Sequence, residues 1–186
     1  WGNNHHWMFE FKNKLYIAYH TQTIEKNLNL EETGYRCVFI NEMKVNDDGS
    51  LPIQKVTKEG VLQTCKFNPN KKTPAATFHS TRNIVVSENL SVTPIKNNAW
   101  IQIKGVDFSQ EPSAITFTSN NQKSKGTINV VLENFASDKV LATVEINGKG
   151  DFSAPLSFTD ADTFSTEQNL FFVFSGNVEI SEWECK

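Results

Sequence analysis

Apolar and polar residues alternate along most of the chain, with a period of two that is typical of strands. The alternation over 7–11 and 15–19 predicts a hairpin joined by a short polar turn. A further strand is expected over 35–45, because the turn sequence Asn-Asp-Asp-Gly-Ser at 46–50 closes it. The segment 23–32 is polar, and we expect a loop there, with a short helix as the alternative.

The alternation is interrupted at 66–74, a polar segment with two prolines and three lysines that is typical of a domain boundary. Beyond it no stretch keeps a helical period, and clusters of Gly, Asn and Ser separate about seven short expected strands, which predict a β-sandwich. Residues 1–64 hold roughly four or five expected strands, too few to bury a core alone. The strands of the second part are expected over 84–86, 100–106, 114–118, 127–132, 140–146, 170–175 and 178–185.

The composition is that of an ordinary soluble globular chain, with 38% apolar and 21% charged residues. The net charge is −3 and no run of like charge occurs, which argues against nucleic acid and membranes as partners. No apolar run approaches the roughly 18 residues of a membrane-spanning helix. The 14 Phe and four Trp suit strands, and they also suit sugar-binding surfaces, where flat rings stack on apolar sugar faces.

The three cysteines, Cys37, Cys65 and Cys185, are too widely spaced for a zinc motif and too few for a disulfide scaffold. Two alternatives stay open: one bridge with one free thiol, or three thiols.

The segments GNNHHWMFEFKNKLYIAYHTQ and GYRCVFINEMKVNDDGSLP resemble the C-terminal part of the catalytic domain of glycoside hydrolase family 43. The resemblance is strongest to its arabinofuranosidase and arabinoxylan-debranching members. It implies that residues 1–66 form the last part of a five-bladed β-propeller, and that this catalytic domain is incomplete here. A propeller blade takes about 40–45 residues, so the segment amounts to roughly one and a half blades.

The resemblance also implies a function, that of a secreted hydrolase of arabinoxylan. Such an enzyme removes α-L-arabinofuranosyl branches, or cleaves β-xylosides, with inversion, using carboxyl groups about 6.5–9.5 Å apart. In the family these carboxylates lie N-terminal to the matched segment. We therefore assign no catalytic residue to this chain and expect it to be inactive alone, the missing N-terminal part of the domain being its partner. Carboxylates that we interpret as solvated are Glu10, Glu25, Glu31, Glu32, Asp47 and Asp48.

Residues that support the active site are implied at three positions. His5, with His6 beside it, matches a family histidine that lies near the propeller axis beneath the substrate sugar. A metal, often calcium, or an ordered water occupies that place in many members, so His5 is a candidate ligand in a water-rich calcium shell. Arg36 matches an arginine that reaches the sugar. We interpret His20 as structural support; a structural histidine pair is the alternative for His5 and His6.

Residues 67–186 resemble carbohydrate-binding module family 6, which implies a jelly-roll β-sandwich. The matching positions are Phe67-Asn68-Pro69, residues 98–108, Gly150-Asp151-Phe152 and residues 170–174. The family usually opens with carboxylates that hold a structural calcium. Here that stretch is 74–78, Pro-Ala-Ala-Thr-Phe, and the closing Asp of the family falls near Ser181, so we predict no calcium in this module.

The sugar-binding cleft of the family is also altered. Phe152 stands where a Trp is expected, and Glu179 where an Asn is expected; these two are the candidate carbohydrate-binding residues. The segment between 84 and 99 lacks the second aromatic. Trp100 and Trp183 are expected in the core. The module is then expected to bind plant cell-wall polysaccharide, arabinoxylan or xylan, through another surface, or only to brace the propeller. A purely binding or structural module is the alternative to the enzymatic function.

Overall fold

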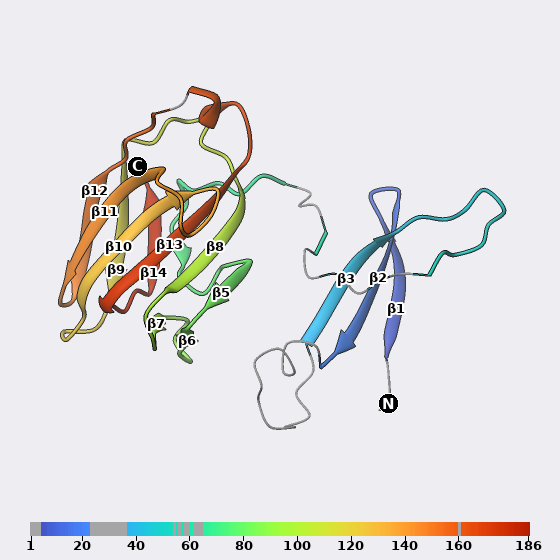
Figure 1. Cartoon of the computed structure of the whole chain (residues 1–186), viewed down its shortest axis with the longest axis horizontal. Coiled ribbons are helices and arrows are strands. Elements are labelled where there is room, and N and C mark those ends of the chain that lie inside the picture. Colours follow the sequence, from blue (N-terminus) through green and yellow to red (C-terminus); the bar gives the residue numbers. More distant parts are fainter. Residues whose placement is uncertain are drawn as a thin grey trace. The chain divides into compact units, whose positions relative to one another are not determined.

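A computed structural model describes residues 5–22, 37–53, 55, 57, 60–61, 65–159 and 161–186. The chain divides into two compact units, Trp1–Gln63 and Thr64–Lys186, each of which is described by itself below (Figure 1). Within the described residues no helix is long and apolar enough to cross a membrane.

The first unit contains a three-stranded antiparallel sheet in the order β1-β2-β3. Strands β1 (His6–Phe11) and β2 (Lys14–Thr21) form the predicted hairpin, and β3 (Cys37–Met43) pairs with the other edge of β2. The turn residues Lys12 and Asn13 have φ of 48° and 59°, the left-handed pair that matches the twist of a two-residue hairpin. The hairpin prediction is therefore confirmed.

This sheet carries apolar side chains on both faces. Cross-strand partners share a face, so the registers Trp7↔Ala18↔Ile40 and Met8↔Ile17 place aromatic and aliphatic groups on opposite sides. Several remain in contact with water: Trp7 is 73% exposed and Val38 is 75% exposed. A sheet that is apolar on both faces is normally covered on both faces.

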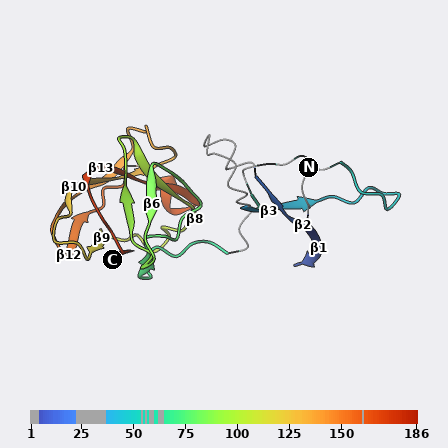
Figure 2. The ribbon, with the colours of Figure 1, turned by 90° about the horizontal axis from the view of Figure 1, so that it is seen from below.

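The second unit is a sandwich of two antiparallel sheets. One sheet has the order β11-β10-β13-β8-β5 and the other β12-β9-β14-β4, while β6 and β7 form a separate hairpin. Seen from below, β10 and β13 lie in one layer and β9 and β12 in the other (Figure 2). The all-β prediction is confirmed, and the structure adds the short strands and a 3-10 helix, η1. The bounds are β4 (Thr73–Pro74), β5 (Ser80–Arg82), β6 (Ile84–Val86), β7 (Val92–Pro94), β8 (Ala99–Val106), β9 (Ala114–Ser119), β10 (Lys125–Leu132), β11 (Val140–Asn147), β12 (Gly150–Pro155), η1 (Ala161–Phe164), β13 (Gln168–Asn177) and β14 (Glu182–Cys185).

An aromatic core joins the two sheets. The Phe172 ring of β13 lies edge-on to Phe117 of β9 at 4.8 Å and to Trp183 of β14 at 4.9 Å between ring centroids. Phe67, which comes just before β4, stacks on Trp183 at 5.6 Å. Trp183 is fully buried, as predicted. Such rings bury large areas and prefer these edge and offset geometries, so they hold the sheets together.

Two glycines allow β10 and β13 to approach closely at one end of the larger sheet. Gly126 pairs with Gly176, whose φ is +86°, and a Cβ at Gly176 would lie 2.7 Å from the carbonyl oxygen of Lys125. A side chain at Gly176 would therefore meet both an unfavourable backbone conformation and a backbone clash.

We expect Gly176→Ala to lower the free energy of unfolding of the second unit by about 2–4 kcal/mol, because strain and clash add. Gly148→Ala is the matched control: its φ is +101°, but the new Cβ would lie 3.6 Å from the nearest atom, an ordinary contact. The control should lose about 1 kcal/mol, from the backbone conformation alone. Urea unfolding followed by circular dichroism measures both, and equal losses would contradict the close approach.

Candidate functional site

His5 and His20 lie side by side at one end of the first sheet. The backbone N–H of His5 donates to Nε2 of His20 at 3.1 Å, and the two ring centroids are 5.4 Å apart. His5 and His6 are both exposed, and His6 is the first residue of β1, paired with Tyr19. The sequence predicted support from His20, and the structure brings it to His5. Arg36 lies outside the described residues.

The described residues near His5 do not by themselves fit a calcium ion. Calcium prefers six to eight oxygen ligands, whereas His5 and His20 offer ring nitrogens, and the bond from His5 already uses Nε2 of His20. Across the described ranges no group of three or more His, Cys, Asp or Glu side chains lies close enough to hold a metal. A calcium ion here would need oxygen ligands from elsewhere, and it stays a prediction.

Phe152 and Glu179, the candidate sugar-binding residues, lie in different settings. Phe152 on β12 is paired with the buried Phe117, and its half-buried ring packs against the core. Glu179 lies between β13 and β14, where its backbone N–H donates to the Ser124 hydroxyl at 2.9 Å. The Oε1 atom of Glu179 is buried and has no hydrogen-bond partner in the described part of the chain.

Neutral hydrogen bonds surround Ser181, the residue that the resemblance to family 6 puts near the closing Asp of the calcium site. The backbone N–H of Ala75 donates to the Ser181 carbonyl at 2.8 Å. The Asn120 amide donates to the Ser181 hydroxyl at 3.0 Å, and that hydroxyl donates to the Thr118 carbonyl at 3.2 Å. These residues bring no carboxylate, so they do not fit calcium.

Trp100 lies outside the core, so the sequence prediction for it was wrong. Burial alternates along β8, which turns Ile101 and Ile103 inward and Trp100 outward. There the ring of Phe135 stacks on Trp100 at 5.5 Å with an interplanar angle of 8°, and Phe171 meets Trp100 edge-on. Phe135 is 42% exposed, so the stack presents an aromatic surface on the larger sheet.

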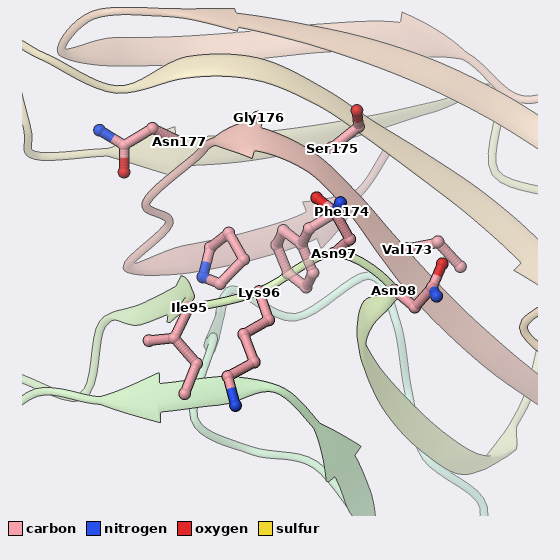
Figure 3. Close-up of a pocket in the computed structure, with 10 residues that line it drawn as sticks. Ile95, Lys96, Asn97, Asn98, Val173, Phe174, Ser175, Gly176 and Asn177 are labelled. Atoms are coloured by element: carbon pink, nitrogen blue, oxygen red, sulfur yellow. The ribbon is translucent and has the colours of Figure 1, made fainter.

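An open pocket lies beside this stack, between the loop that leads into β8 and the end of β13 (Figure 3). Its volume is about 580 Å³. Val173, which lines it, is the register partner of Trp100. No local pattern in the sequence indicates this pocket, because its two halves are some 75 residues apart along the chain. The lining residues are Pro94, Ile95, Lys96, Asn97, Asn98, Val173, Phe174, Ser175, Gly176 and Asn177; we call this site the β13 pocket.

Comparison with known proteins relates both units to one group of enzymes, although no family model matches the chain. An arabinoxylan arabinofuranohydrolase from Bacillus subtilis (strain 168) is 31% identical over 181 residues, which cover 92% of this chain and 35% of that protein. The chain thus spans about a third of the length of this curated relative. A solved family 43 arabinoxylan arabinofuranohydrolase from Bacillus subtilis, in complex with cellotetraose, matches 100% of this chain and 41% of its own, with TM-score 0.80 and 28% identity.

The second unit has its own structural neighbours. A family 6 module, CsCBM6-3 from Clostridium stercorarium, in complex with cellobiose, matches 67% of this chain and 98% of its own, with TM-score 0.55 and 19% identity. This likeness shows that the second unit shares the jelly-roll fold of that module. The chain is therefore homologous to part of a glycoside hydrolase. The predicted resemblance to family 43, and within it to the arabinoxylan arabinofuranohydrolases, is confirmed.

Glu179→Gln should leave the stability of the second unit unchanged or raise it by about 1 kcal/mol, because it removes a charge from an oxygen that lacks a donor. Thermal unfolding of both proteins measures this. A loss of more than 1 kcal/mol would mean that the carboxylate has a structural partner, and would contradict the assignment of Glu179 to ligand binding.

Proposed function

We propose that the chain is the C-terminal part of a secreted family 43 hydrolase. In this proposal the enzyme acts on plant cell-wall arabinoxylan, removing α-L-arabinofuranosyl branches or cleaving β-xylosides with inversion. Its catalytic carboxylates belong to a preceding part of the same polypeptide. The observation that carries the proposal is the first sheet, which is apolar on both faces and needs further sheets on either side.

The carboxylates of the first unit support this assignment, because those described do not converge. Glu42 forms an ion pair with Lys14 at 2.9 Å and lies across from Tyr16. Glu10 lies across from Leu15, on the opposite face of the sheet from Glu42. Asp48 accepts hydrogen bonds from Ser50, which lower its pKa below the ordinary value, as expected of a turn residue. An inverting pair must face one water molecule from two sides.

What this chain supplies in the proposed mechanism is positioning. The bond from the His5 backbone to His20 fixes the start of β1 and leaves the exposed His5 ring able to donate to a sugar hydroxyl or to water. Arg36 would orient sugar hydroxyls and the upstream carboxylates through its charged guanidinium. The acid and base steps belong to residues outside the chain.

A second candidate function is polysaccharide binding by the second unit without catalysis. The stack of Phe135 on Trp100 favours it, because an exposed flat ring is what a sugar face packs against. This function is compatible with the first, since a binding module keeps an attached enzyme on an insoluble substrate.

The first test is catalysis by the purified chain. We expect no release of arabinose from arabinoxylan and no turnover of an aryl arabinofuranoside, because no inverting pair is present among the described carboxylates. The full-length gene product should release arabinose. Turnover by the 186-residue chain alone would contradict the assignment of the catalytic residues to an upstream part.

A substitution in the full-length enzyme tests the role of His5. His5→Ala should lower kcat/KM by about 100-fold, since a misplaced substrate reacts more slowly. Glu10→Gln, on the strand that begins directly after His5, is the control and should leave kcat/KM within about twofold, because this exposed carboxylate has no assigned role. Equal effects of the two substitutions would contradict a role of His5 in positioning the substrate.

A further inference from the structure

We propose that the β13 pocket binds a carboxylate-bearing sugar, a uronosyl unit carried by the polysaccharide. The inference deepens the proposed function and rests on it only in taking the ligand to be a polysaccharide. It concerns a site that includes neither Phe152 nor Glu179.

The size and construction of the pocket suit a sugar unit. Its volume of about 580 Å³ lies within the range of small-ligand sites. The loop that forms one wall is held in place, because the Asn83 amide donates to the Asn97 carbonyl at 2.8 Å and Ile95 N–H donates to the Asn83 carbonyl at 2.9 Å. The opposite wall belongs to β13, whose Phe174 is buried. A site formed before binding loses less entropy when it binds.

The polar groups of the pocket match a ligand rich in hydroxyls. Asn97, Asn98 and Asn177 bring three side-chain amides from two separate segments, and Ser175 adds a hydroxyl. In Figure 3 the side chains of Asn97 and Asn98 lie beside Phe174 and Val173. None of the three amides makes a hydrogen bond with the described residues of the chain. Each amide can both donate and accept, as a sugar hydroxyl does.

The charge of the pocket selects for an anion. Lys96 is the only charged residue among those that line it, and no carboxylate faces it from either wall. Five other lysines form the ion pairs found within the described ranges, and Lys96 forms none of these. Lys96 lines the same pocket as these neutral amides, and an ammonium group favours a carboxylate over a hydroxyl through a charge-assisted hydrogen bond. Because the site is open to water, the preference should be modest and should fall with added salt.

The test measures binding of the 186-residue chain, by calorimetry, to two probes: xylotetraose, and xylotetraose with one glucuronosyl branch. We expect the branched probe to bind at least fivefold more tightly at low salt. Lys96→Gln should abolish this preference and leave the affinity for xylotetraose within about twofold. Lys71→Gln removes an exposed lysine outside the pocket and should keep the preference.

A second variant removes amides without disturbing the fold. Asn98 has φ +58°, so Asn98→Gly keeps the backbone conformation while deleting the amide; it is combined with Asn177→Ala. The double variant should lose at least tenfold in affinity for the branched probe while its thermal unfolding temperature stays within a few degrees. Lys96→Arg, which retains the charge, should keep the preference for the branched probe that Lys96→Gln abolishes.

The proposal would be overturned by equal affinity of the unaltered chain for both probes, by loss of the preference in Lys71→Gln, or by unchanged binding by the double variant. Loss of binding in Phe135→Ala instead would keep the sugar-binding function but place the site at the aromatic stack rather than in the β13 pocket. Failure to bind either probe would overturn the assignment of the β13 pocket as a sugar site. It would not affect the hydrolase proposal, which the arabinose-release assay tests separately.

Discussion

A β-sheet with apolar side chains on both faces is stable in water only when other protein covers both faces, and this constraint decides how the first unit is understood. Trp7 and Met8 are neighbours on β1 and therefore point to opposite sides, and both are exposed. Hydrogen bonds between the three strands pair backbone groups but cannot remove this apolar area from water. The sheet is best explained as one layer of a larger domain, as the homology to a longer hydrolase also indicates.

The second unit is different because its two sheets cover each other. The rings of Phe117, Phe172 and Trp183 meet between the layers and leave the outer faces free to vary. In the same unit neutral hydrogen bonds surround Ser181, where the resemblance to family 6 led us to predict no calcium. The Trp100–Phe135 stack lies on the outer face of the larger sheet, and Val173, the register partner of Trp100, also lines the β13 pocket.

Local patterns predicted the parts of this structure that depend on neighbours in sequence. Alternation gave the β1–β2 hairpin, and it also placed the buried Trp183 correctly. It failed for Trp100, because an aromatic residue on a strand fits either face and only the register of β8 with β13 decides which. The β13 pocket combines the loop 94–98 with the end of β13, and no local pattern encodes a site whose two parts are distant in sequence. The contact of His5 with His20 became apparent only from the strand pairing.

The central claim is that this chain is one part of a longer hydrolase whose catalytic carboxylates lie upstream. The most direct test is the intact mass of the polypeptide isolated from its native source, together with its N-terminal sequence. We predict a mass more than twice the 21.0 kDa of the chain, with Asp and Glu residues of the active site in the added segment. A mature polypeptide of 21 kDa that begins at Trp1 would contradict the account, because the two-sided apolar sheet would then lack the domain that it requires.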